Sequence, residues 1–129
     1  MKIYKPLFIK EEYEPLMKGS YLKFNQLIKL HNDIDSFFDE YWQDVKNNDK
    51  IFFETVKRIK NLIQFTEKNY NNFIEELDIR TGKDYTNWIE RAKEQLKKAV
   101  KDKSVMFLDT SYASIHNFIK QIKDEEGEV

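Results

Sequence analysis

The chain of 129 residues contains no cysteine, three glycines, two prolines and two histidines. The absence of cysteine excludes disulfides, thiolate-bound metals, iron–sulfur clusters and cysteine nucleophiles. The shortage of glycine and proline argues against a β-rich or loop-rich fold, because these residues mark most turns. With no cysteine and only two histidines, the chain has few side chains suited to catalysis or metal binding. We therefore predict that the protein is not an enzyme and carries no cofactor.

The sequence also lacks a strong net charge and a long apolar run. Lysine and arginine number 22 against 23 for aspartate and glutamate, so the formal net charge is -1. Such a balance gives no overall attraction to nucleic acid or to an anionic membrane. The apolar run near the N-terminus is broken by charge and proline, unlike a signal peptide, and no window is long enough to span a bilayer. We therefore expect a soluble, cytoplasmic protein.

The residues that are abundant point to one helical domain. Hydrophobic residues make up 40% of the chain, aromatic residues 15% and charged residues 35%. Disordered chains are poor in aromatic residues, and a chain of this length can bury a sizeable core. We expect residues 1–129 to form a single domain, with an extended segment at 1–19 and an acidic, frayed tail at 124–129.

The strongest structural signal lies between Ile51 and Ile79. Apolar positions alternate there at spacings of four and three residues: Phe52, Val56, Ile59, Ile63, Thr66, Tyr70, Phe73 and Leu77. This spacing keeps one stripe of an α-helix facing a partner surface. It predicts one unbroken, central helix of roughly 45 Å. The helix is expected to end near 80–82, because Gly82 suits a left-handed C-terminal position.

Three further helices are predicted around it. The first runs from about Tyr21 to Val45, after a cap at Ser20, and the turn at 47–49 caps the next helix and folds it back as an antiparallel hairpin. The third spans about Tyr85 to Lys101, and Asp84 or Thr86 can cap it.

The last predicted helix spans Ser111 to Lys123. Residues 104–109 fit either its first turns or a short buried strand, and we favour helix because the only candidate strand partner is the N-terminus. An N-cap role explains Asp109 or Ser111 at this start. The expected fold is therefore all-α: an antiparallel four-helix bundle with a long central helical hairpin and a short N-terminal extension.

The two histidines are the candidates for chemistry. His31 lies on the apolar stripe of the first helix, and Asp35 and Asp39 follow at four-residue steps. This set could bind a divalent metal or act as an acid–base pair. The Glu-x-x-His pattern of metal sites in helical bundles is absent, so we expect no metal and interpret His31 as a partly buried residue bonded to a neighbouring side chain. The sequence does not decide whether His116 approaches it.

A binding role is the leading hypothesis. Phe65 lies off the main stripe, on the side of its helix that carries Arg58, where another helix or another chain must cover it. Acidic residues crowd the second half of the first helix, and a basic partner could dock there. We predict a non-enzymatic interaction protein (an accessory subunit, inhibitor or adaptor) that binds a protein partner or itself as a homodimer. Its predicted contact residues are Phe65, Arg58, Asp35, Asp39 and Glu40.

The alternative hypothesis is a nucleic-acid-binding accessory subunit. Lysines recur on one face of the third helix, at Lys93, Lys97 and Lys101 with Lys98 nearby, and others mark the first half of the 51–79 helix. If the two sets met, they would form a phosphate-contacting surface. No helix-turn-helix, zinc-finger or RNA-recognition signature accompanies them. A metal-dependent enzyme at His31, Asp35 and Asp39 is the third hypothesis.

Overall fold

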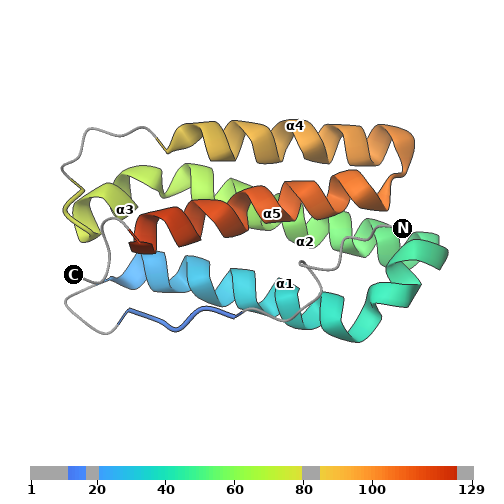
Figure 1. The fold of residues 1–129 in the computed structure, drawn as a ribbon, viewed down its shortest axis with the longest axis horizontal. Coiled ribbons are helices and arrows are strands. Elements are labelled where there is room, and N and C mark those ends of the chain that lie inside the picture. The colour runs from blue at the N-terminus through green and yellow to red at the C-terminus, as the bar shows by residue number, and fades with distance from the viewer. Residues whose placement is uncertain (1–11, 17–20, 80–84, 125–129) are drawn as a thin grey trace.

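A computed structural model describes residues 12–16, 21–79 and 85–124, and these ranges contain five α-helices and no strand. The helices are α1 (Leu22–Asn47), α2 (Asp49–Lys68), α3 (Tyr70–Glu76), α4 (Thr86–Asp102) and α5 (Val105–Ile122), as Figure 1 shows. The all-α bundle is thus confirmed. No helix among the described residues is long and apolar enough to cross a membrane. The predicted caps at Ser20, Gly82 and Asp84, the tail at 125–129 and most of the 1–19 segment lie outside the described residues.

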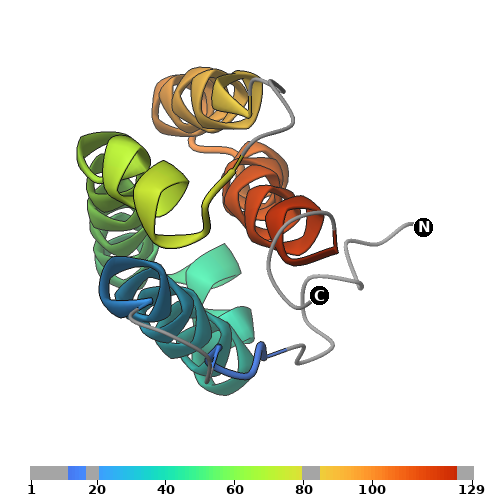
Figure 2. The same ribbon diagram turned by 90° about the vertical axis from the view of Figure 1, so that its left-hand side faces the viewer.

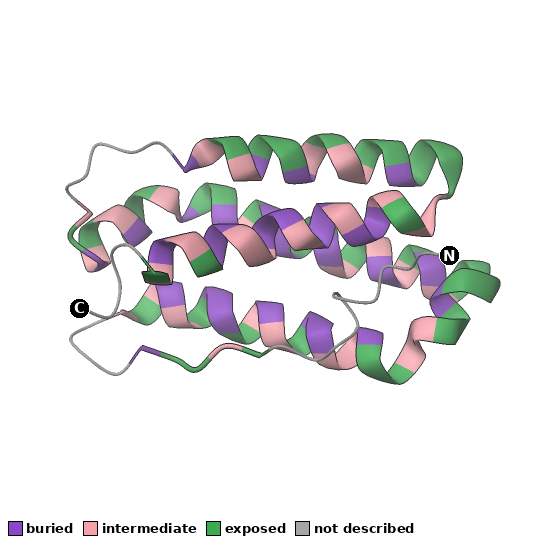
Figure 3. Ribbon diagram, in the orientation of Figure 1, coloured by how far each residue is buried: buried purple, intermediate pink, exposed green. Residues whose placement is uncertain are grey.

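Two helical hairpins make up the bundle. Helix α1 packs mainly against α2, and α4 packs most extensively against α5. The end-on view places α4 and α1 on opposite sides, with α2 and α5 between them (Figure 2). The buried residues follow the inward faces of the helices, and they are densest on α5 (Figure 3). Half of the 18 residues of α5 are buried, so α5, rather than the predicted 51–79 helix, is the most deeply packed element.

The unbroken helix predicted for 51–79 is wrong at Asn69. Helix α2 ends at Lys68 and α3 resumes at Tyr70, because Asn69 leaves the helical conformation (φ -106°, ψ 15°). The side-chain amide of Asn69 donates to the Phe65 carbonyl at 3.0 Å, and this carbonyl also accepts the backbone N–H of Asn69 at 3.0 Å. The apolar stripe still continues through the break, since Phe73 on α3 is fully buried.

The end of α3 also differs from the prediction. The helix stops at Glu76, well before Gly82, and Asp78 takes the left-handed conformation with φ 52°. The Ile79 N–H bonds the Ile74 carbonyl at 3.1 Å, and the Asp78 N–H bonds the Glu75 carbonyl at 3.3 Å. These are the two bonds of a Schellman motif, in which aspartate here takes the position usually held by glycine.

The other helix starts follow short polar turns. The Asn48 side chain accepts the Ile51 N–H at 3.2 Å, as the predicted 47–49 turn requires. Ser104 caps α5 by accepting the Phe107 N–H at 3.2 Å, so residues 105–109 form the first turns of the helix, which is the favoured alternative. Asp109 therefore lies inside the helix rather than at its cap, and Thr86 is the first residue of α4 rather than its cap.

The first turn of α1 is capped from a distant helix. Tyr21 at its N-cap makes no side-chain cap bond. Instead the Glu76 carboxylate of α3 accepts the Lys23 N–H at 2.8 Å and the Phe24 N–H at 3.0 Å. A carboxylate there satisfies two amides and faces the positive end of the helix dipole.

We expect Glu76→Ala to lower the free energy of unfolding by about 1–2 kcal/mol, since it removes a charged cap. Glu75→Ala, an exposed neighbour on the same short helix, should change it by less than about 0.5 kcal/mol. Urea denaturation of both variants checks the difference. Equal effects would show that the Glu76 bonds contribute nothing beyond helix propensity.

Two asparagines of α1 hold the segment 12–16, which forms no helix or strand. The Tyr13 N–H donates to Asn32 Oδ1 at 3.0 Å, and Asn32 Nδ2 donates back to the Tyr13 carbonyl at 2.8 Å. Asn25 repeats the arrangement with Leu16, at 2.8 Å for both bonds. The two asparagines are seven residues apart, so they lie on one face of α1. The segment is thereby fixed along that helix, with Leu16 buried.

Candidate functional site

The residues predicted to contact a protein partner differ in how far they are buried. Arg58 lies over the Phe37 ring of α1 at 4.2 Å, and Phe65 is half-buried against Phe73, with ring centroids 6.4 Å apart. Both therefore pack within the chain. Asp35 is buried, whereas Asp39 and Glu40 are exposed on α1.

Three of the four lysines predicted for the alternative site do come together, in a groove between α2 and α4. The groove has a volume of about 570 Å³. Its apolar residues are Val56 and Ile63 of α2 and Leu96 and Val100 of α4. Its lysines are Lys60 of α2 and Lys93, Lys97 and Lys101 of α4. We call this surface, with Gln64 and Glu67 at its side, the α2–α4 groove.

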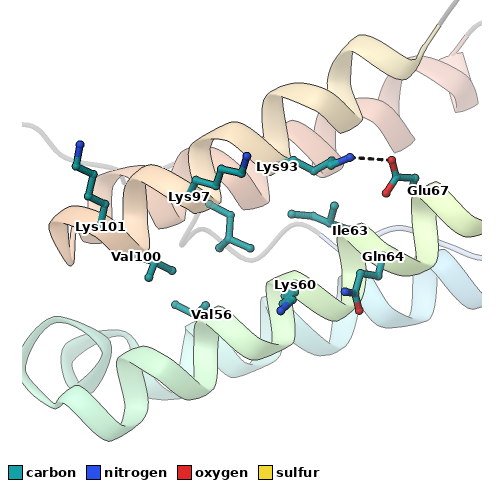
Figure 4. A pocket seen from close by; sticks show the side chains of 10 residues that line it. Val56, Lys60, Ile63, Gln64, Glu67, Lys93, Lys97, Val100 and Lys101 are labelled. Atoms are coloured by element: carbon teal, nitrogen blue, oxygen red, sulfur yellow. Dashed lines mark hydrogen bonds and ion pairs between the residues drawn. The ribbon is translucent and has the colours of Figure 1, made fainter.

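Helical periodicity produces this division into an apolar floor and a cationic rim. On α4 the lysines recur every four residues, and Leu96 and Val100 each precede a lysine by one position. The apolar row of Leu96 and Val100 therefore faces α2, while the row of lysines lies beside it. Figure 4 shows Val56, Ile63 and Val100 between the two helices, with the side chains of Lys97 and Lys101 extending from α4 away from α2.

The groove is open because α4 packs more closely against α5 than against α2. Ala92 and Ala99, the small residues on the inner face of α4, are fully buried. Ser111 of α5 donates to the Ala92 carbonyl at 2.7 Å, a bond that requires close approach of the two helices. The α2 side of α4 is left short of apolar cover, and Val100 remains 44% exposed. Phe53, which is 47% exposed, lies on the same face of α2 one turn before Val56.

The rim is only partly neutralised. Lys93 pairs with Glu67 across the groove at 2.9 Å and with Glu90 at 3.8 Å, and the bond to Glu67 raises the pKa of Lys93. Lys60, Lys97 and Lys101 have no ion-pair partner among the described residues.

Lys98, the fourth predicted lysine, does not line the groove. Its ammonium lies 5.7 Å from the Phe107 ring centroid. Helical geometry turns it away from its neighbour Lys97 by about 100°. The lining of the groove contains no histidine, aspartate, serine, threonine or tyrosine, and its ionisable side chains are Glu67 and the four lysines.

A second cluster joins the two histidines, which the sequence left unplaced relative to each other. His31 Nε2 lies 2.8 Å from His116 Nδ1, and His31 is fully buried. Tyr112 Oη lies 3.1 Å from His31 Nε2, and Tyr13 Oη lies 3.2 Å from His116 Nε2. His31 is thus bonded to neighbouring side chains as interpreted, although it is fully rather than partly buried. Sequence reasoning missed the two tyrosines.

Burial controls the titration of the residues around this cluster. Desolvation lowers the pKa of His31 from 6.5 to about 4, and it raises the pKa of Tyr112 well above its usual value. Desolvation also raises the pKa of Asp109 from 3.8 to about 8, and Asp109 Oδ1 has no hydrogen-bond partner among the described residues. Among the described residues no group of three or more histidine, aspartate or glutamate side chains could hold a metal ion.

Comparison of the chain with protein-family models, with curated proteins and with solved structures finds no match. Any function must therefore be inferred from the chemistry of the α2–α4 groove and of the histidine cluster.

Proposed function

We propose that the protein is a non-enzymatic interaction protein that binds an acidic amphipathic helix of a protein partner in the α2–α4 groove. The observation that carries the proposal is an apolar floor, with Val100 44% exposed, between lysines of α2 and α4. An apolar stripe on the partner would cover the floor, and acidic residues beside that stripe would meet the lysines.

The length of the groove suits a helix. From Val56 to Glu67, α2 rises by roughly 16 Å, and from Lys93 to Lys101, α4 rises by roughly 12 Å. About three turns of a bound helix would fit this length. Two to three apolar side chains at i, i+3 or i+4, and i+7 spacing would then enter the space between α2 and α4.

Several features favour a protein helix over nucleic acid. The lining contains neither arginine nor an aromatic residue, the side chains that usually read or stack on bases. Phosphates would leave the apolar floor uncovered, and Lys93 is already paired with Glu67. The nucleic-acid alternative stays a prediction, and it becomes one outcome of the test.

The test is fluorescence anisotropy with a designed probe. The probe is a helix-forming peptide of about four turns, with leucine at i, i+3, i+4 and i+7 spacing and glutamate at the flanking positions. We expect saturable, salt-sensitive binding, and we expect Val100→Asp to weaken it at least about tenfold, since it places a carboxylate in the apolar floor.

Matched charge variants locate the binding site. Lys97→Glu with Lys101→Glu should weaken binding strongly, because the lysines of the rim become acidic. Lys50→Glu with Lys68→Glu makes the same change in net charge at exposed positions outside the groove, and it should have little effect. Equal losses in the two double variants would contradict a specific groove.

Three other outcomes would also overturn the proposal. The first is equal binding of a peptide with lysine in place of glutamate. The second is tighter binding of a single-stranded oligonucleotide that depends on the same lysines. The third is a groove-dependent dimer in light scattering, which would identify a second copy of the chain as the occupant.

A further inference from the structure

The histidine cluster joins three separate parts of the chain. His31 and Asn32 belong to α1, His116 and Tyr112 to α5, and Tyr13 to the segment 12–16. The Tyr13 ring lies 5.0 Å from both imidazole centroids and is nearly parallel to that of His116, at 26°. The tyrosine thus covers the histidine pair, and the pair connects the N-terminal segment to both helices.

The bonds of Asn32 determine which nitrogen of each histidine carries the proton. Asn32 Oδ1 accepts the Tyr13 N–H while its Nδ2 donates to the Tyr13 carbonyl. Exchanging the oxygen and nitrogen of this amide would place its NH2 group against the Tyr13 N–H, so the orientation of the side chain is fixed. Its Oδ1 also lies 2.9 Å from His31 Nδ1. An amide oxygen only accepts, so His31 Nδ1 must carry a proton.

The assignment then passes to His116. In neutral His31, Nε2 is an acceptor, so the His116 Nδ1 at 2.8 Å must donate to it. His116 Nε2 is then the acceptor for the Tyr13 hydroxyl at 3.2 Å. Tyr112 has a separate acceptor, the His31 carbonyl at 3.2 Å. All of these bonds are satisfied when both rings are neutral.

One added proton can be accommodated, but two cannot. If His116 Nε2 gains a proton, the Tyr13 hydroxyl can accept from it and donate instead to the His116 carbonyl at 3.1 Å. If both rings are protonated, His31 Nε2–H and His116 Nδ1–H point at each other across 2.8 Å. The bond between the two rings is then lost, although the Tyr112 hydroxyl at 3.1 Å can accept from His31 Nε2–H, and two like charges meet in a buried place.

Other titratable and charged groups surround the pair on each element packed against it. They are Glu12 and Tyr13 of the segment 12–16, Asp35 of α1, Asp109 and Tyr112 of α5, and Lys123 directly after α5. The carboxylates favour a proton on the pair, whereas Lys123, 5.5 Å from the Tyr13 centroid, opposes it. Glu12 also accepts a bond from Ser36 at 3.0 Å, so its own titration needs a control.

We propose that the His31–His116 pair is a pH-sensitive latch that holds the segment 12–16 on α1 and α5 while both rings are neutral and releases it when they are protonated. The depressed pKa of His31 gives the direction and the window of the change. The latched state disfavours the proton, so latching is strongest above about pH 6.5 and weakens down to about pH 4. A shift of this size changes the latching equilibrium about 300-fold.

The first test is ring ¹⁵N NMR of the intact protein, which contains only two histidines. At neutral pH both should carry their proton on Nδ1. A proton on Nε2 of either ring would contradict the assigned bonds. Independent titration of both rings near pH 6.5 would overturn the latch.

The second test is hydrogen exchange at the Tyr13 amide, expressed as a protection factor relative to the Ile63 amide in α2. We expect the ratio to fall by up to about 100-fold between pH 7 and pH 4. His116→Gln should weaken this pH dependence without removing it, because the like charge beside His31 is gone while the burial that lowers the pKa of His31 most remains. A pH-independent ratio in the natural chain would reject the proposal, whatever the variant does.

Two control variants separate the latch from other contacts. Asn25→Ala removes the non-titrating clamp on Leu16, so protection should fall at every pH while its pH dependence persists. Glu12→Gln removes the only titrating group of the Ser36 bond and should leave most of the pH response. A response abolished by Glu12→Gln would assign the switch to that carboxylate and overturn the proposal.

Discussion

Replacing Asp109 with asparagine is expected to stabilise the protein at pH 8 but not at pH 4, with a difference of about 4 kcal/mol between the two. Asp109 is 3% exposed, its Oδ1 has no hydrogen-bond partner in the part of the chain that the structure describes, and burial raises its pKa from 3.8 to about 8. Asparagine has nearly the same shape and does not ionise. The variant therefore avoids the cost of keeping a buried carboxyl protonated.

The sign of this effect follows from proton binding. Between about pH 3.8 and pH 8 the folded protein keeps the Asp109 proton while the unfolded chain has released it. The folded state of the natural chain therefore becomes less favourable as pH rises through that range. Any packing or hydrogen-bonding cost of the new amide is the same at both pH values, so it cancels in the comparison.

Urea denaturation at pH 4, 6 and 8 measures the effect. The matched control is Asp39→Asn, the same change at an exposed position of α1, and it should alter stability little at any pH. A pH-independent result for Asp109→Asn would show that this carboxyl is ionised in the folded protein.

His31 makes the pH profile of the variant distinctive. The pKa of His31 is lowered to about 4, so its contribution to stability is complete above about pH 6.5 and falls as the pH drops to 4. In the natural chain, stability gained from His31 as the pH rises from 4 to 6.5 is offset by the stability lost through Asp109 over the same pH range. We therefore expect stability that is nearly flat up to pH 6.5 and then declines, whereas the Asp109→Asn variant rises up to pH 6.5 and then levels off.

Phe73→Ala is expected to cost about 4 kcal/mol of unfolding free energy, the usual loss for a fully buried aromatic residue. Phe73 is 0% exposed. Its ring meets Phe24 of α1 edge-on at 5.7 Å and Phe118 of α5 at 6.2 Å. The substitution leaves a cavity among three helices. It also removes the buried side chain that holds α3, a helix of only seven residues, against the core.

The control for this prediction is Phe53→Ala, the same substitution at a ring that is 47% exposed. It should cost much less, because its ring already contacts solvent and its removal leaves no enclosed cavity. Both variants can be compared by their urea midpoints at neutral pH. A loss below about 1.5 kcal/mol for Phe73→Ala would mean that the surrounding helices collapse into the space.

Periodicity was sufficient to place most helices, but it could not show the break in the second one. Helix α1 was predicted at 21–45 and found at 22–47, and α4 was predicted at 85–101 and found at 86–102. The break at Asn69 was missed because the apolar stripe passes through it without a change of spacing. The bond from Asn69 to the Phe65 carbonyl is local, and asparagine makes such bonds in loops and helices alike.

The sequence predicted the α4 side of the groove but not which helix lies opposite it. Four-residue spacing identified the row of Lys93, Lys97 and Lys101, since residues four apart share a helix face. The contribution of α2 was less visible, because no local pattern shows which helices will be neighbours. The histidine cluster was harder still, since the bond from Tyr13 to His116 joins residues 103 positions apart.

The distant cap on α1 has a consequence for the order of folding. Glu76 lies 52 residues along the chain from the Phe24 amide that it caps, so the contact closes a long loop and cannot assist the start of this helix early. The first turn of α1 should therefore be consolidated after α3 has docked, and a low φ-value is expected at Glu76. Loss of this cap would then act mainly by accelerating unfolding, leaving the rate of folding almost unchanged.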